Sequence, residues 1–151
     1  MSEYEFTVSL RIRHPTLDPA VLTATLGIEP QHSWRAGQPR RDAAGEGLGG
    51  THHDSYWMAR LMAEPELSGA GMSVESVIVQ TLTHLRRAQT FLERLSDEGG
   101  VAELLVSLYA RESFRIELPP DALCLLGRLR LTVALDIHPH PPLAAQPSRP
   151  N

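Results

Sequence analysis

The sequence predicts an α+β fold, with a mainly antiparallel five- to six-stranded sheet and one long and two short helices packed mostly on one face. Two observations carry this prediction. Apolar residues recur at three- and four-residue steps over residues 73–95, the pattern of an amphipathic helix. Residues 4–13 and 129–137 alternate between apolar and polar types, as strands with one buried face do. Because buried parallel strands show continuous apolar runs instead, this alternation favours antiparallel pairing.

The first strand is expected at residues 4–13, ending near His14, and a short helix should follow it. Asp18 can accept a backbone hydrogen bond at the N-cap, and Pro19 fits the first helical position. Gly27 is a common helix stop, since glycine readily adopts the left-handed conformation there.

Residues 28–54 show neither the alternation of a strand nor the apolar spacing of a helix, and they are rich in glycine and proline. We expect a long irregular loop here, with a short extended piece at residues 32–35 and mobility at residues 40–50. Loops of this length in compact domains are usually functional or disordered. A second main strand is expected at residues 55–62, with Trp57 on one face and Tyr56 on the other.

The long helix at residues 73–95 is the most strongly patterned element of the chain. Ser73 can cap its first turn, Glu75 suits its positive end, and two glycines at 99–100 stop it. A continuous helix of this length would be roughly 34 Å long at 1.5 Å per residue. Its expected apolar stripe consists of Val74, Val77, Ile78, Thr81, Leu82, Leu85, Ala88, Leu92 and Leu95.

After this helix, residues 101–110 have apolar side chains on both faces, which is typical of an interior strand. Residues 114–118 alternate and predict the second arm of a hairpin. A last short helix should occupy residues 119–127, before the final strand at 129–137. We therefore expect a single α+β domain over residues 1–138 and a Pro-rich, extended or disordered tail over 139–151.

Composition limits the class of protein. The 151 residues carry a net charge of −4, so a nucleic-acid partner is disfavoured. No apolar run approaches the roughly 18 residues of a membrane span, and the first residues show no basic region followed by an apolar one, so we expect no secretion signal. We expect a cytoplasmic protein, from a bacterium because every basic residue except histidine is arginine. The single Cys124 has no internal disulfide partner.

Three stretches of the chain are similar to motifs of a known family. They are the helix with its flanks at residues 17–30, the Trp34-Arg35-Ala36-Gly37 motif followed by Trp57, and the ending from Phe114 through Leu126-Gly127 to the last strand. Together they resemble the bacterial domain-of-unknown-function family 4279 over nearly the whole chain except the tail. The resemblance implies an α+β domain and brings no activity, cofactor or catalytic residue. Pro119 and Pro120 depart from the serine-like cap expected at the last helix.

The loop between Trp34 and Trp57 is the strongest candidate site. The guanidinium group of arginine can form two parallel hydrogen bonds with a phosphate or carboxylate, and the indole face of tryptophan stacks on bases or cations. Both residue types also dominate protein interfaces. Because Trp57 falls within a predicted strand, a core position is favoured for it, whereas Trp34 fits either place. The candidate binding residues are Trp34, Arg35, Arg40, Arg41, His52, His53 and Trp57.

The run His52-His53-Asp54 also invites interpretation as a metal site. Adjacent residues can ligate one ion only where the backbone turns sharply, and no zinc-binding spacing such as HExxH is present. We therefore predict no metal and no cofactor, and interpret these histidines as exposed loop residues.

The leading hypothesis is a small non-enzymatic binding module that engages a protein partner, or a second copy in a homodimer, through this loop and a sheet edge. The alternative is a small-molecule-binding or hydrolytic enzyme whose anionic substrate is recognised by Arg35, Arg40 and Arg41. A deep pocket with perturbed titratable groups would favour the enzyme, and a flat patch around Trp34 the module. No catalytic residue is assigned.

Overall fold

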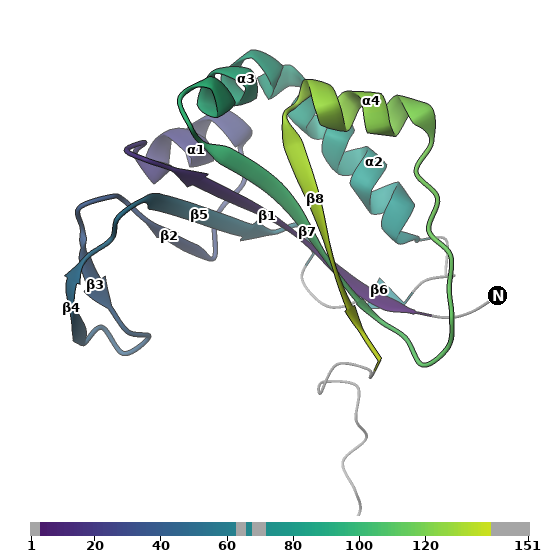
Figure 1. Cartoon of the computed structure of the whole chain (residues 1–151), viewed down its shortest axis with the longest axis horizontal. Coiled ribbons are helices and arrows are strands. Elements are labelled where there is room, and N and C mark those ends of the chain that lie inside the picture. Colours follow the sequence, from purple (N-terminus) through teal and green to yellow (C-terminus); the bar gives the residue numbers. More distant parts are fainter. Residues whose placement is uncertain (1–3, 63–65, 68–71, 140–151) are drawn as a thin grey trace, which may run out of the picture.

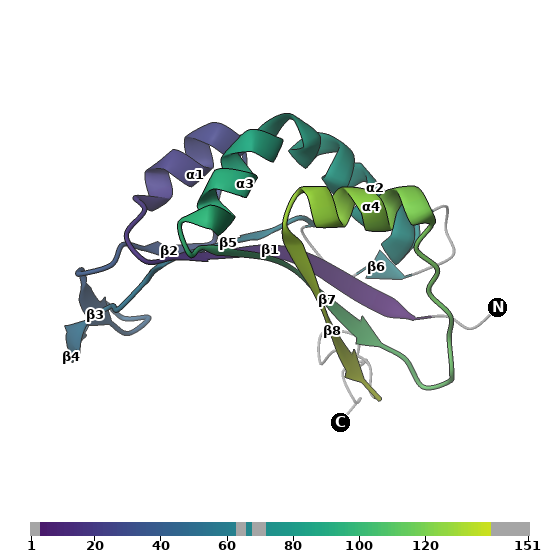
Figure 2. The same ribbon diagram turned by 45° about the horizontal axis from the view of Figure 1, so that its top comes forward.

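The computed structural model describes residues 4–62, 66–67 and 72–139. Figure 1 shows the elements, and Figure 2 shows helices on one face of an arched sheet. The strands are β1 (Glu5–His14), β2 (His32–Trp34), β3 (Pro39–Arg41), β4 (Gly47–Thr51), β5 (Ser55–Arg60), β6 (Glu66–Leu67), β7 (Val101–Tyr109) and β8 (Leu131–His138). The helices are α1 (Pro19–Leu26), α2 (Val74–Leu85), the 3₁₀ turn η1 (Arg86–Ala88), α3 (Gln89–Asp97) and α4 (Pro120–Arg128).

The main sheet has the strand order β2-β5-β1-β7-β8, and β6 also pairs with β1. β1 runs antiparallel to β5, β6 and β7, while β7 and β8 form a parallel pair joined through α4. The predicted α+β class with a mainly antiparallel sheet is thus confirmed. The alternation of β1 is confirmed as well, because its apolar side chains are buried beneath the helices. These side chains are Tyr4, Phe6, Val8, Leu10 and Ile12.

Helix α1 forms where the sequence predicts it. The Asp18 carboxylate accepts a hydrogen bond from the Ala20 N–H at 3.0 Å, and Pro19 occupies the first turn. Gly27 ends the helix in the left-handed conformation, with φ at 67°.

The predicted long helix is confirmed over residues 74–97, but it is not one continuous rod. Ser73 and Ser76 form a reciprocal capping box at its start, and η1 then interrupts the ladder between α2 and α3. Figure 2 shows the segment bending over the arched sheet. Apolar spacing cannot reveal this break, since a short 3₁₀ turn changes the rotation too little to expose the stripe. Leu85 and Ala88 both stay buried at the junction.

The predicted hairpin arm at residues 114–118 is wrong, because this segment forms no strand. Its alternation reflects burial on one side: Phe114, Ile116 and Leu118 pack against the core while the residues between them face outward. The Glu117 N–H donates to the Glu75 carboxylate of α2 at 3.0 Å rather than to a neighbouring strand. Instead, β8 pairs with β7, in parallel, so β7 is an interior strand as predicted.

The expectation of one irregular loop over residues 28–54 is also wrong. The predicted extended piece is β2, which pairs with β5, and β3 and β4 form a separate hairpin. The Asp42 carboxylate shapes the hairpin turn by accepting hydrogen bonds from the N–H groups of Ala44 and Glu46, each at 2.9 Å. The hairpin residues are exposed on both faces, so no apolar pattern could mark these strands in the sequence. Mobility of residues 40–50 stays a prediction.

At the end of the chain, β8 stops at His138. The tail predicted over 139–151 lies, from residue 140 onward, outside the described residues. Across the described ranges, no helix combines the length and apolar character that crossing a bilayer requires.

Candidate functional site

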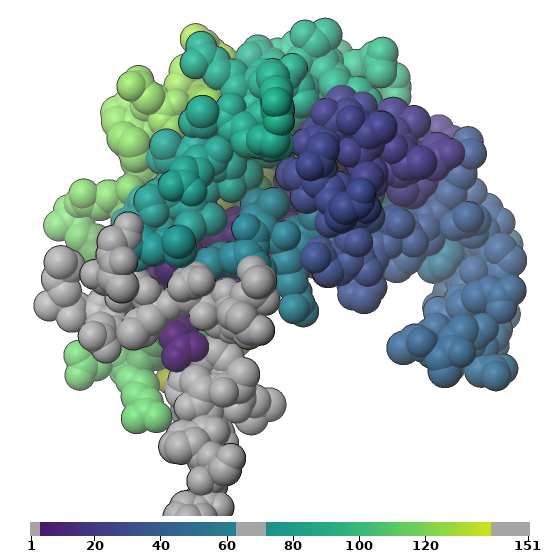
Figure 3. All heavy atoms as spheres, turned by 180° about the vertical axis from the view of Figure 1, so that it is seen from behind, coloured from purple at the N-terminus to yellow at the C-terminus, as the bar shows by residue number. Residues whose placement is uncertain are grey.

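The helices cover one face of the main sheet, and the opposite face is concave. Figure 2 shows this concave face with the β3–β4 hairpin at one end and the ends of β7 and β8 at the other. From behind, Figure 3 shows the hairpin standing away from the body of the molecule, with a hollow between them. The odd-numbered side chains of β1 project onto this face, because the even-numbered ones fill the core.

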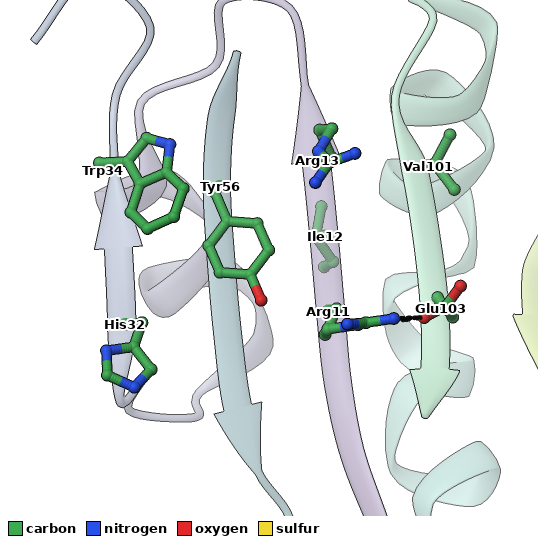
Figure 4. A pocket seen from close by; sticks show the side chains of 8 residues that line it. All are labelled: Arg11, Ile12, Arg13, His32, Trp34, Tyr56, Val101 and Glu103. Carbon is green, nitrogen blue, oxygen red and sulfur yellow. Dashed lines mark hydrogen bonds and ion pairs between the residues drawn. The ribbon is translucent and has the colours of Figure 1, made fainter. Parts of the chain in front are cut away.

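A cleft of about 510 Å³ lies on the concave face (Figure 4). Strand register brings its residues together: Trp34 pairs with Tyr56, which lies opposite Arg13, and Arg13 lies opposite Val101. The lining residues come from β1, β2, β5 and β7 and are Arg11, Ile12, Arg13, His32, Trp34, Tyr56, Val101 and Glu103.

One wall of the cleft is aromatic. The Trp34 indole stacks on the Tyr56 ring with 4.6 Å between ring centroids and an angle of 23° between the planes. It also stacks on the His52 imidazole, at 4.3 Å and 14°. Trp34 is only partly buried, and its indole lies at the surface. The stacks on Tyr56 and His52 hold it in place there. A ring held in this way loses little conformational entropy when something binds against it.

The floor of the cleft carries two arginines that differ in their partners. The Arg11 guanidinium donates to the Glu103 carboxylate from Nε at 3.0 Å and also from a terminal nitrogen. This hydrogen bond raises the pKa of Arg11 above its ordinary value, against the opposing effect of burial. Arg13 is exposed, and its side chain has no ion pair or hydrogen bond among the described residues. Arg13 is therefore the cation of the cleft that is available to an incoming anion.

The structure separates the residues that the sequence grouped into one loop. Trp34 and His52 meet in the aromatic stack. Arg35 lies 3.5 Å from the Asp18 carboxylate at the start of α1. Arg40 and Arg41 lie on the exposed hairpin strand β3, and neither lines the cleft.

The other two predicted residues also lie away from the cleft. The exposed His53 imidazole lies 3.0 Å from the Asp54 carboxylate. Trp57 is fully buried in the core, where its indole N–H donates to the Thr23 hydroxyl at 3.1 Å. This is the core position that its place in a strand favoured, and it excludes Trp57 from direct contact with a partner at the surface.

Comparison with known proteins identifies the domain. The family model described as "Domain of unknown function (DUF4279)" matches residues 3–140. The chain belongs to this family. The resemblance seen in the sequence motifs is confirmed, and the match spans β1, β2, β5 and β7, so the cleft lies within the DUF4279 domain. Searches of curated proteins and of solved structures give no match.

Sequence reasoning missed Arg11, Arg13, His32 and Tyr56 of the DUF4279 cleft. The alternation of β1 does place both arginines on the polar face of that strand. It cannot say which side chains lie beside them, because the partners of β1 are set by strand order and register. The sequence held one weak signal for Tyr56. Because Tyr56 precedes a core tryptophan in a strand, alternation places the Tyr56 side chain on the open face of the sheet.

A buried histidine near the cleft has a structural role. In His14, Nδ1 accepts hydrogen bonds from the Thr16 and Leu17 N–H groups at 3.0 and 2.9 Å. Its Nε2 lies 2.9 Å from the Glu98 carboxylate and donates to it, because Nδ1 is already the acceptor. Both ring nitrogens are thus used to hold the turn after β1 against the end of α3.

Metal removal is expected to leave the fold unchanged. The part of the chain that the structure describes contains no group of three or more His, Cys, Asp or Glu residues suited to holding an ion. We expect the melting temperature to be the same with and without a chelator such as EDTA, because no ligand set links metal binding to folding. Stoichiometric zinc retained by untagged protein, or a lower melting temperature after chelation, would contradict this prediction.

Proposed function

We propose that this DUF4279 protein is a non-enzymatic binding module that engages a protein partner through its concave face. The observation that carries the proposal is the pairing of a preorganised aromatic stack with an available arginine in one open cleft. Tryptophan, tyrosine and arginine are the residue types most enriched at the energetic centres of protein interfaces. Trp34, Tyr56 and Arg13 supply one of each.

The chemistry of the cleft favours an acidic segment of the partner. Arg13 can form a two-pronged hydrogen bond with a carboxylate, and the aromatic wall can contact an apolar side chain next to that carboxylate. Arg11 keeps the floor in place through its ion pair with Glu103. We therefore expect the partner to present an Asp or Glu beside an aliphatic or aromatic residue.

Two features support a module over an enzyme. The cleft lies across neighbouring strands of the sheet face and is only partly enclosed, with its lining side chains contributed by β1, β2, β5 and β7 (Figure 4). The second is that the Glu103 carboxylate raises the pKa of the Arg11 guanidinium, which lies in the cleft. A guanidinium with a raised pKa stays protonated near neutral pH, so it cannot serve as a general base.

A small anionic ligand is the second candidate. The cleft volume of about 510 Å³ falls within the range of small-molecule sites, roughly 300–1,000 Å³. A planar anion could stack against Tyr56 while its carboxylate or phosphate binds Arg13. The same residues would then bind a metabolite or an enzyme substrate in place of a protein segment.

The test compares Trp34→Ala and Arg13→Ala with the wild type in pull-downs from the native host, followed by titration of the purified partner. Each variant is expected to bind about 30-fold more weakly or worse, the loss that about 2 kcal/mol at an interface centre produces. Arg128→Ala is the matched control, because it removes an exposed arginine from α4 on the covered face. Near-ultraviolet circular dichroism checks that each variant is folded.

Retention of every partner by both variants would refute the module. Inorganic phosphate and benzoate, added in separate thermal-shift titrations, examine the second candidate. Stabilisation by either anion that Arg13→Ala abolishes, without any captured protein, would favour the small-ligand function over the module.

A further inference from the structure

Strand β8 forms one edge of the main sheet. Its inner edge pairs with β7 in continuous register from Leu131 opposite Ala102 to His138 opposite Tyr109. Within the described ranges, no strand pairs with its outer edge. The eight residues of β8 include no proline, lysine or arginine, and its register shows no bulge. Edge strands usually carry such features because an unprotected edge pairs with other strands.

The apolar layer of the sheet continues to this edge and ends there uncovered. Leu135 lies opposite Val106 and Ile137 lies opposite Leu108, and both β7 residues are fully buried. In contrast, the Leu135 and Ile137 side chains are 52% and 63% exposed. Figure 1 shows the end of β8 extending beyond α4, which packs over the start of the strand. Any strand that pairs with β8 will therefore also meet an apolar stripe.

We propose that β8 pairs with β8 of a second copy of this chain, antiparallel and about a two-fold axis at Leu135. This register places Leu135 opposite Leu135 of the second copy and Val133 opposite Ile137, so that each apolar side chain meets another. On the concave face it places Asp136 opposite Ala134 and Thr132 opposite His138, with no like charges directly opposed. A two-fold interface must be self-complementary. The apolar stripe of Val133, Leu135 and Ile137 meets this condition, because it pairs with itself in this register.

Pairing at β8 leaves the cleft open in both copies. The cleft is lined from β1, β2, β5 and β7, and Leu135 and Ile137 project from the opposite face of the sheet. The dimer therefore presents two clefts on one continuous sheet. A partner with two binding segments would engage the second at high effective concentration. The dimer itself does not depend on the proposed function, because it rests on β8 alone.

Sedimentation equilibrium of the full chain tests the dimer. We expect a monomer–dimer equilibrium for the wild type and at least about tenfold weaker association for Ile137→Lys, which places two new charges at the interface. Val79→Lys is the matched control, because Val79 is an aliphatic side chain of α2 that is 40% exposed. Its association should equal that of the wild type. A monomeric wild type, or a dimer that Ile137→Lys leaves intact, overturns the proposal.

A cross-linking experiment tests the register without introducing charge. In a Cys124→Ser background, which removes the free thiol of the described residues, Leu135→Cys should form an intermolecular disulfide under mild oxidation, since the two-fold axis brings the two copies of this residue together. Thr132→Cys is the control and should not cross-link, because it faces His138 of the second copy. Equal cross-linking of the two variants, or none for Leu135→Cys, overturns the proposed pairing.

Discussion

Replacing Trp57 by alanine is expected to reduce the free energy of unfolding by about 3–5 kcal/mol, the usual loss for a large aromatic core residue. Trp57 is the largest fully buried side chain among the described residues. Its removal leaves a cavity between β5 and α1 and also removes the hydrogen bond to Thr23 that links them. Urea denaturation followed by far-ultraviolet circular dichroism measures the loss.

Tyr56→Ala is the matched control for Trp57→Ala. Tyr56 precedes Trp57 on β5 but projects onto the concave face, where it stacks on Trp34. We expect this change to cost clearly less than Trp57→Ala, because Tyr56 is only half-buried and loses the energy of one aromatic pair, about 0.5–1.5 kcal/mol, together with part of its apolar contact area. Equal losses for the two variants would mean that the assignment of the two faces of β5 is wrong.

Leu85→Ala is expected to lower stability by about 2–5 kcal/mol. Leu85 is the last residue of α2, is 1% exposed, and lies at the junction with η1. The cavity forms where the helical segment bends over the sheet, so the loss should be near the upper end if the junction cannot collapse. Thermal unfolding and urea titration both report the change.

Val79→Ala is the control on the same helix, since the Val79 side chain is 40% exposed. Alanine favours helix more than valine does, so this variant should keep the wild-type stability within about 0.5 kcal/mol. A melting temperature for Leu85→Ala within about one degree of the wild type would show that the buried face of α2 is misassigned.

The DUF4279 domain shows which parts of a fold are encoded locally. β1, β5, α1 and the helical segment over residues 74–97 were predictable, because each contrasts a buried side with an exposed one. Residues 114–118 show the same contrast yet form no strand, since apolar alternation records one-sided burial and not hydrogen-bond pairing. The β3–β4 hairpin shows the reverse case, in which strands pair with no buried face and leave no apolar signal.

The cleft shows what a sequence leaves open about a site. The residues flanking Trp34 predicted a binding surface there, and its ring does lie at the surface. Arg35, Arg40 and Arg41 were grouped with it because they are close in sequence, but turns carry them to other surfaces. Arg13, from the first strand, takes the expected place beside the aromatic wall.

The sequence by itself determined the α+β class, the family, the core position of Trp57 and the open side of β1. These follow from the order of residues along one segment, since side-chain alternation and helical spacing are local. Only the tertiary structure decided that Trp34, Tyr56 and Arg13 form one cleft and that β8 is left at an edge. Both depend on strand order and register, which result from the packing of the whole chain and leave no trace in any one segment.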